Sequence, residues 1–163
     1  MTKLLTIAIP TYNRSKACIK TVQNFVDQIK ENNLENKVQI LVSDNASKDD
    51  TFIRLKEIQL QNPNILLINT NNENLGFAKN CQYLLENTTS KYIWTCGDDD
   101  TYSLTALKTV INHLENKDIV YLFINCWWPK KNKELQKGVR ITTDFLGTFI
   151  EAMNIIRDSA SYM

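Results

Sequence analysis

The sequence predicts a doubly wound α/β fold, in which helices flank both faces of a mainly parallel sheet. Two observations favour this fold. Short apolar, β-branched segments alternate with amphipathic segments over the first 125 residues, and polar residues follow directly after four of the apolar segments. Alternation of this kind is typical of a parallel sheet. The length of 163 residues, of which 43% are hydrophobic, suits one domain with an ordinary core.

Five strands and four helices are expected in strict alternation. The first helix has the clearest pattern, because apolar residues from Cys18 to Ile29 recur at helical spacing. Ser47 and Ser103 are expected to cap the second and fourth helices. Another helix is expected at residues 143–157. The strands are expected at residues 4–9, 38–42, 65–68, 92–96 and 119–124, and the four helices at 15–31, 47–61, 77–86 and 104–114.

Composition excludes several classes of protein. The 19 basic and 18 acidic residues nearly cancel, so the basic surface of a general nucleic-acid binder is absent and no nucleic-acid partner is expected. The four cysteines form no C-x-x-C pair and His113 is the sole histidine, which argues against a zinc site. Reduced, buried cysteines suit a cytoplasmic protein. No signal peptide or membrane-spanning segment is expected, and phosphate-binding glycine motifs are missing.

Polar residues gather where four of the expected strands end. They are the segments Pro10–Arg14, Ser43–Ser47, Asn69–Gly76 with Lys79 and Asn80 after it, and Asp98–Asp100. Ligands of open parallel sheets bind at the carboxyl ends of the strands. We therefore expect these four segments to converge on one cleft.

The run Asp98-Asp99-Asp100 is the sharpest of these features. Adjacent carboxylates repel and raise one another's pKa unless a cation lies between them. Oxygen ligands suit Mg²⁺ or Mn²⁺. In an extended segment Asp98 and Asp100 would project to one side and Asp99 to the other, so the first and third are expected to share a metal. The alternative is a solvated acidic turn before Ser103.

Three further side chains could recognise a nucleotide. Asp44 follows a buried strand and could accept hydrogen bonds from a ribose or a base, or it could be an ordinary loop acid. Tyr12 offers a ring to lie against a base, or it is a surface tyrosine. Lys79 could offset phosphate charge, or it is a solvated helix lysine.

In order and spacing, four blocks resemble family 2 glycosyltransferases. The blocks are Ile7–Arg14, Val42–Thr51, Asn74–Asn80 and Gly97–Asp100, so the resemblance covers about residues 3–125. Their details look most like bacterial transferases that build O-antigen or other surface polysaccharides, including abequosyltransferase-like enzymes. The resemblance implies the GT-A fold, in which a nucleotide-diphospho-sugar binds together with a divalent metal.

The resemblance also implies roles for particular residues. It assigns Asp98 and Asp100 to a Mn²⁺ or Mg²⁺ ion. Asp44 would recognise the base. An acid at this position fits uracil most simply, but cytosine and guanine also remain open, so the expected donor is UDP-, CDP- or GDP-linked. By the same resemblance, the residues expected to bind the nucleotide-sugar are Pro10, Thr11, Tyr12, Arg14, Asp44, Asn45, Gly76, Lys79, Asp98 and Asp99.

The inverting enzymes of this family also use a carboxylate as general base, which is expected beyond Met163. Asp144, Glu151 and Asp158 are expected to be surface charges. Residues 1–125 would then form the nucleotide-sugar-binding core, and residues 126–163 the start of an acceptor-side half that this chain contains in part. The expected enzyme transfers a hexose or deoxyhexose to a glycan or lipid-linked acceptor.

That enzyme would act in the cytoplasm, or at the inner face of the cytoplasmic membrane by peripheral association. Two alternatives remain. A nucleotidyltransferase is also a metal-dependent α/β enzyme, but it usually carries a glycine-rich basic loop where this chain has Pro10–Arg14. A non-catalytic module of the same fold would bind the nucleotide-sugar without transferring it.

Overall fold

The computed structural model describes residues 2–116, 121–123, 127–128, 133–134 and 140–142. The chain divides into two compact units, Met1–Ile111 and Asn112–Met163. The first unit contains the sheet and the cleft discussed below. The functional division expected at residue 125, between donor-binding and acceptor-side halves, stays a prediction.

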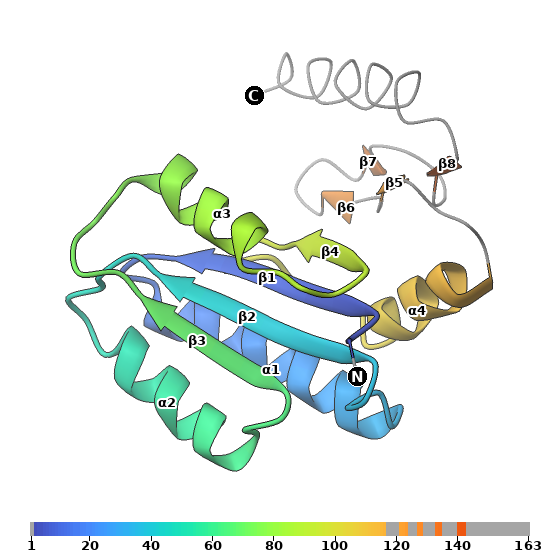
Figure 1. Ribbon diagram of the computed structural model, residues 1–163, viewed down its shortest axis with the longest axis horizontal. Helices are drawn as coiled ribbons and strands as arrows, with labels where there is room; N and C mark the ends of the chain where they lie inside the picture. The colour runs from blue at the N-terminus through green and yellow to red at the C-terminus, as the bar shows by residue number, and fades with distance from the viewer. Residues whose placement is uncertain (1, 117–120, 124–126, 129–132, 135–139, 143–163) are drawn as a thin grey trace. The chain divides into compact units, whose positions relative to one another are not determined.

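A four-stranded sheet forms the centre of the first unit (Figure 1). The strands are β1 (Leu5–Thr11), β2 (Val38–Asp44), β3 (Leu66–Thr70) and β4 (Tyr92–Thr95), in the order β3-β2-β1-β4. Every neighbouring pair is parallel. Thr11 of β1 lies opposite Asp44 of β2, which in turn lies opposite Thr70 of β3, so these three strands end level with one another. The predicted parallel sheet is confirmed.

Helices cover both faces of this sheet. The helices are α1 (Ser15–Glu31), α2 (Thr51–Gln61), α3 (Phe77–Glu86) and α4 (Ala106–Asn116). α3 packs on one face, where Leu84 joins Ala8 and Leu41 in an apolar cluster. α1 packs on the other face, where the ring of Phe25 meets that of Trp94 edge-on at 5.4 Å. Successive strand residues point to opposite faces, which is why β1 serves both layers.

Burial follows from this layering. Leu5, Ile7, Ala8 and Ile9 of β1 are at most 1% exposed, as a strand covered on both faces requires. Gln28 of α1 is also buried, and its amide is fully used. Its Oε1 accepts a hydrogen bond from the Leu107 amide, and its Nε2 donates to the Ser103 carbonyl. A buried polar side chain must be satisfied in this way, and here the bonds attach the start of α4 to α1.

Three expected features differ from the structure. The fourth helix begins at Ala106 rather than directly after its expected cap, Ser103. The second helix begins at Thr51 rather than at Ser47, because the Ser47 hydroxyl donates to the Asp44 carboxylate instead of capping a helix. The expected fifth parallel strand is β5 (Tyr121–Phe123), which pairs antiparallel with β8 (Arg140–Thr142). An apolar run does not encode its partner or direction. The helix expected at residues 143–157 lies outside the described residues.

In the second unit, β6 (Trp127–Trp128) and β7 (Lys133–Glu134) form another antiparallel pair. Within the described part of the chain, no helix has the length and apolar character needed to cross a membrane.

Candidate functional site

A cleft of about 840 Å³ opens at the carboxyl edge of the sheet. One side of it, which we call the charged wall, comprises Thr11, Tyr12, Arg14, Asp98 and Asp99. The other side, which we call the amide wall, comprises Asn45, Asn74, Gly76, Phe77 and Asn80. Pro10, Cys81, Leu84, Thr95, Cys96 and Gly97 complete the lining. The expected convergence of the strand ends on one cleft is confirmed.

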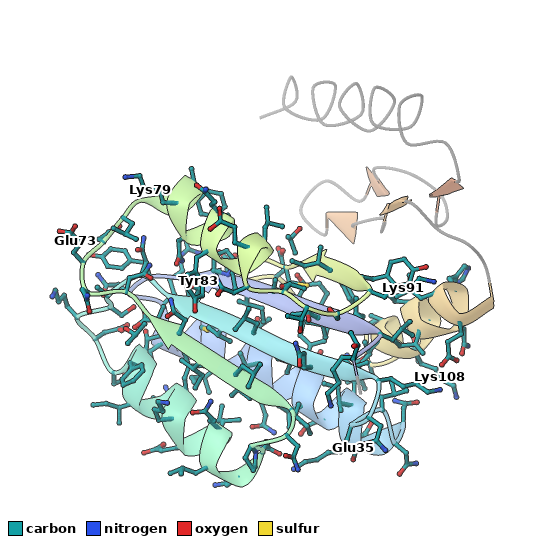
Figure 2. All side chains as sticks on the ribbon, viewed as in Figure 1. Glu35, Glu73, Lys79, Tyr83, Lys91 and Lys108 are labelled. Carbon is teal, nitrogen blue, oxygen red and sulfur yellow. The ribbon has the colours of Figure 1, made fainter. Side chains whose placement is uncertain are left out.

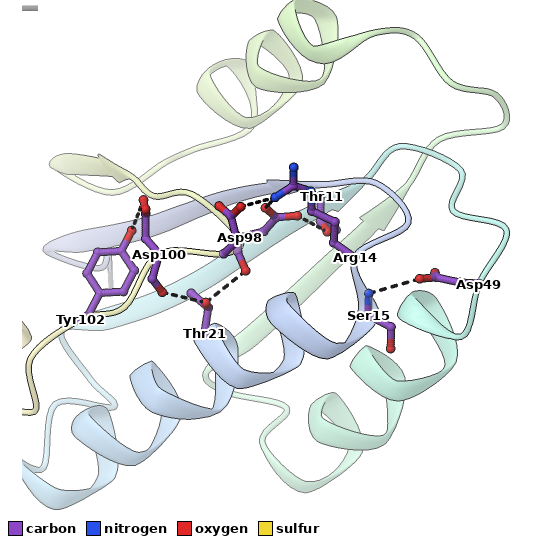
Figure 3. Close-up of polar contacts among 9 residues, drawn as sticks. Thr11, Arg14, Ser15, Thr21, Asp49, Asp98, Asp100 and Tyr102 are labelled. Atoms are coloured by element: carbon purple, nitrogen blue, oxygen red, sulfur yellow. Dashed lines mark hydrogen bonds and ion pairs between the residues drawn. The ribbon is translucent and has the colours of Figure 1, made fainter. Parts of the chain in front are cut away.

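On the charged wall, Asp98 is held by the end of β1 and by α1 (Figure 3). The Thr11 hydroxyl donates to Asp98 Oδ2 at 2.7 Å. From α1, the buried Thr21 hydroxyl lies within hydrogen-bond distance of the carbonyl oxygens of Asp98 and Asp100, at 3.1 and 3.2 Å. These contacts fix both the backbone of the acidic turn and the direction of the Asp98 carboxylate.

Arg14 supplies the positive charge of this wall. Its Nη1 lies 3.7 Å from Asp98 Oδ1 and forms a close ion pair with Asp99 Oδ2. The Arg14 side chain is 52% exposed and that of Asp99 is 56% exposed, so both are in reach of a ligand. An exposed pair of this kind contributes at most about 1 kcal/mol to stability. The guanidinium is therefore free to exchange partners at little cost.

The geometry of the acidic turn differs from the one expected. Arg14 joins Asp98 and Asp99, whereas Asp100 does not line the cleft and its Oδ2 accepts a hydrogen bond from the Tyr102 hydroxyl at 3.3 Å. The expectation that Asp98 and Asp100 share one side assumed an extended segment. Residues 98 and 99 form a bend instead, so the alternation of a strand does not apply.

Burial raises the pKa of Asp98 above its ordinary value. The hydrogen bond from Thr11 and the charge of Arg14 act in the opposite direction, and the neighbouring Asp99 raises the pKa further. The protein alone therefore does not fully offset the cost of burying the charged form of this carboxylate. A cation bound at this place would stabilise its ionised form.

The residues present fit a divalent metal that shares its coordination with a ligand. Among the residues described, no group of three or more acidic, histidine or cysteine side chains could hold an ion by itself. Mg²⁺ is usually bound by one or two carboxylates together with substrate phosphates. Asp98 and Asp99 offer two such carboxylates at the cleft. The donor set is therefore suited to a metal–diphosphate pair rather than to a cage built from protein alone.

Most of the residues expected to bind a nucleotide-sugar line the cleft, with two exceptions. Asp44 is 1% exposed, and its carboxylate accepts hydrogen bonds from the Ser47 amide and hydroxyl. Lys79 is exposed on α3 and points away from the sheet (Figure 2). The residues that do line the cleft are Pro10, Thr11, Tyr12, Arg14, Asn45, Gly76, Asp98 and Asp99.

The amide wall contains residues whose importance the sequence analysis did not reveal. Asn80 is 2% exposed and bonds to both the hydroxyl and the carbonyl of Ser43. A signal was present in the sequence, since Asn80 precedes the buried Leu84 by four residues and so shares its helix face. A polar residue on the buried face of a helix must find partners.

Phe77 is a second residue of the amide wall that the sequence analysis did not single out. It is 75% exposed and lines the same cleft.

Comparison with known proteins agrees with this fold. The model of the family described as glycosyl transferase family 2 matches residues 6–158. The chain therefore belongs to glycosyl transferase family 2, and the GT-A fold that the sequence predicts is confirmed.

One curated relative is a GalNAc(5)-diNAcBac-PP-undecaprenol beta-1,3-glucosyltransferase from Campylobacter jejuni subsp. jejuni serotype O:2. It is 26% identical over 152 residues, which are 90% of this chain and 43% of the relative. The chain thus spans less than half the length of this relative.

Solved structures share the fold at lower identity. The mannosyltransferase PcManGT from Pyrobaculum calidifontis, in complex with GDP-Man and Mn²⁺, superposes with a TM-score of 0.64 and 19% identity, over 75% of this chain and 35% of that one. S. aureus TarS 1-349 in complex with UDP-GlcNAc superposes with a TM-score of 0.57 and 19% identity, over 67% of this chain and 30% of that one.

Proposed function

We propose that the cleft binds a nucleotide-diphospho-sugar together with Mn²⁺ or Mg²⁺, and that this chain is the donor-binding part of an inverting glycosyltransferase. One observation carries the proposal. In a family 2 chain, two carboxylates and a guanidinium meet in one cleft at the carboxyl edge of the sheet. Paired acids for a metal and an arginine for phosphate are the groups that a diphosphate requires.

Each residue of the charged wall then has a distinct task. Asp98 and Asp99 would hold the metal, which would neutralise charge on the departing diphosphate. Thr11 keeps the Asp98 carboxylate oriented through its hydrogen bond. Arg14 would turn from the acids to a phosphate oxygen, where charge-assisted hydrogen bonds are strong. Tyr12, which is 38% exposed at the cleft, would offer its ring to the base.

The expected partners follow from the same site. The donor would carry a hexose or deoxyhexose, and the acceptor would be a glycan or a lipid-linked saccharide of a bacterial surface polysaccharide. Two observations on other proteins support this: solved neighbours are complexes with GDP-Man or UDP-GlcNAc, and the Campylobacter relative is named for an undecaprenol-linked saccharide. Such an enzyme would work in the cytoplasm or at the inner face of the cytoplasmic membrane.

The general base that deprotonates the acceptor hydroxyl is not assigned to a residue of this chain. In an inverting reaction it would typically contribute about 10²–10⁴-fold to the rate. We place it beyond Met163, in the part of the relatives' length that this chain does not span. The proposal is therefore tested by measuring whether this chain binds the donor nucleotide.

Isothermal titration of the 163-residue chain with UDP, CDP and GDP, each with and without Mn²⁺, tests it directly. We expect one of the three to bind, and to bind more tightly with Mn²⁺. Asp98→Asn removes one charge from the acid pair and should abolish most of the gain from Mn²⁺. Asp27→Asn, an exposed acid in α1, is the matched control and should change nothing. Equal binding of all nucleotides with and without Mn²⁺, or none by the wild-type chain, would refute the proposal.

A further inference from the structure

Both polar atoms of the Asn45 side chain form hydrogen bonds within the protein. Its Oδ1 accepts hydrogen bonds from the Leu75 amide and from Asn71 Nδ2, both at 2.9 Å. Its Nδ2 donates to Asn74 Oδ1 at 2.8 Å. A side-chain carbonyl oxygen has two lone pairs, so both acceptor positions of Asn45 are occupied. The residue is 3% exposed, and it borders the cleft without offering an acceptor to a ligand.

These bonds determine how the chain enters α3. Asn74 Oδ1, which receives the bond from Asn45, also accepts the Gly76 amide at 2.9 Å. Gly76 has a φ of +81°, in the region that favours glycine, and Phe77 begins the helix directly after it. The conformation of the cleft-lining segment Asn74–Phe77 therefore depends on the amide of Asn45.

The same segment is anchored from behind by Asn80. Asn71 Nδ2 bonds to Asn45 Oδ1 and also, at 3.1 Å, to Asn80 Oδ1. Asn80 in turn bonds to the hydroxyl and carbonyl of Ser43 at the end of β2. This chain of side-chain amides, of which Asn45 and Asn80 are buried, connects the sheet to the start of α3.

Asn45 also contacts the opposite wall of the cleft. Its backbone amide donates to the Thr11 carbonyl at 3.0 Å. The Thr11 hydroxyl bonds to Asp98, whose partner is Arg14. One residue thus bonds to the end of β1 through its main chain and to the loop before α3 through its side chain.

We propose that Asn45 is a positioning residue, which fixes the amide wall relative to the charged wall and so determines how tightly the cleft fits a nucleotide-diphospho-sugar. This inference rests on the proposed function for its ligand. It replaces the direct contact with the nucleotide-sugar that the sequence suggested for Asn45. The sugar-nucleotide would meet Gly76 and Phe77, held in place by Asn45, rather than Asn45 itself.

Two variants remove these hydrogen bonds, one at a buried position and one at an exposed position in the loop. Asn45→Ala removes all three side-chain bonds, and Asn74→Ala removes the acceptor for Asn45 and Gly76 from an exposed position where folding is not at risk. Asn74→Asp keeps that acceptor and should restore the wild-type behaviour. Asn72→Ala, exposed in the same loop, is the control.

Amide hydrogen exchange over residues 71–77 supplies a readout that needs no ligand. Peptide or NMR data should show exchange about 10-fold faster at Leu75 and Gly76 in Asn45→Ala, and at Gly76 in Asn74→Ala. Asn74→Asp and Asn72→Ala should match the wild type. Unchanged exchange in Asn45→Ala would overturn the proposal, whether or not any nucleotide binds.

Titration of the same variants with the nucleoside diphosphate that the wild type binds most tightly, in the presence of Mn²⁺, tests the effect on the cleft. We expect affinity to fall about 10-fold in Asn45→Ala and Asn74→Ala, and to stay within twofold in the other two variants. Weaker binding without faster exchange would show a direct contact and overturn the positioning role. Faster exchange with unchanged affinity would also overturn it. Absence of binding by the wild type would refute the proposed function, leaving hydrogen exchange to decide whether Asn45 holds the loop.

Discussion

The two walls of the cleft use polar residues in opposite ways. On the charged wall, Asp98 and Asp99 share one guanidinium, and burial leaves the pKa of Asp98 raised. On the amide wall, Asn45 and Asn80 are neutral, at most 3% exposed, and bonded to neighbouring residues. The first wall retains capacity for an incoming cation or phosphate. The second has its polar atoms satisfied and serves as a scaffold.

This difference shows how one cleft combines binding with a fixed shape. Groups that bind a charged ligand must stay partly unsatisfied in its absence, which costs stability. Neutral amides that satisfy one another impose no such cost and hold a loop in one conformation. We therefore expect substitutions on the charged wall to alter binding more than folding. On the amide wall, those near β2 should alter folding and those near Gly76 should alter fit.

The largest expected difference between the walls is in cysteine reactivity. Burial raises the pKa of Cys96, beside the acidic turn, to about 12, and that of Cys18 in α1 to about 12. Compared with an ordinary thiol, this lowers the thiolate fraction at pH 8 by about 1,000-fold. Cys81, in α3, lines the cleft beside the amide wall and is only partly buried, and that partial burial raises its pKa.

Iodoacetamide at pH 8 should therefore modify Cys81 in the folded protein and leave Cys18 and Cys96 unmodified. Peptide mapping by mass spectrometry distinguishes these sites from Cys126. Because Cys81 lines the cleft, a bound nucleoside diphosphate should slow its modification. Modification of Cys96 as fast as that of Cys81 would contradict the burial of Cys96.

The next effect concerns folding on the amide wall. Asn80→Ala removes a buried amide and leaves the Ser43 carbonyl without its partner from α3. We expect a loss of about 2–3 kcal/mol in the free energy of unfolding, from the unpaired polar group and the space left behind. Urea unfolding measures it. Lys79→Ala, at the neighbouring exposed position, should stay within about 0.5 kcal/mol of the wild type; an equal loss in both variants would mean that Asn80 has no special role.

Local periodicity explains which elements were predictable. The limits of α1 and α3 agree with the expected residues 15–31 and 77–86, because each helix has a regular apolar stripe and α3 starts directly after Gly76. The parallel sheet followed from the alternation of such elements. The carboxyl edge of the sheet could be predicted as the place of the cleft, because polar segments follow the strands in the sequence.

Contacts between distant segments explain what was not predictable. The acidic turn bends where Thr21 of α1 meets two of its carbonyl groups, so Asp99 rather than Asp100 joins Asp98 at Arg14. Nothing in the sequence near residue 98 encodes that contact. Asn69 lies at the end of β3, and the asparagines after it lie in the loop before α3. Asparagine serves equally well as a loop residue and as a buried amide, so the sequence does not show which of these asparagines hold the loop.

A smaller effect, on Mn²⁺ affinity, is expected when Arg14, the cation of the charged wall, is removed. Arg14→Ala removes the group that pairs with Asp98 and Asp99 in the absence of a metal. Mn²⁺ alone should then bind about fivefold more tightly, which corresponds to about 1 kcal/mol for a partly exposed ion pair. Nucleoside diphosphate should bind more weakly. Electron paramagnetic resonance of free Mn²⁺ measures the first change, and Lys16→Ala, an exposed cation nearby, is the control. Weaker Mn²⁺ binding in Arg14→Ala would show that Arg14 does not compete with the metal.

The smallest effect lies below the charged wall, where Asp49 joins the starts of two helices. Its Oδ2 accepts the Ser15 amide at 3.2 Å, and its Oδ1 accepts the Thr51 amide at 3.0 Å. Burial tends to raise the pKa of Asp49, but hydrogen bonds from Thr51 and Ser15 outweigh it and lower the pKa below 3.8. Asp49→Asn should cost about 0.5 kcal/mol at pH 7, the low end for a helix-capping residue.

The pH dependence of that loss has a definite sign. Since the pKa of Asp49 is lower in the folded state, the unfolded state binds more protons, and the stabilisation is complete above the unfolded value of 3.8. It disappears as the pH falls through the folded value. The difference between wild type and Asp49→Asn in urea unfolding should therefore be equal at pH 7 and pH 5 and should shrink below about pH 4. Asp50→Asn, whose side chain makes no capping bond, should show no difference at any of these pH values. A gap that widened on acidification would mean that Asp49 does not act through its ionised carboxylate.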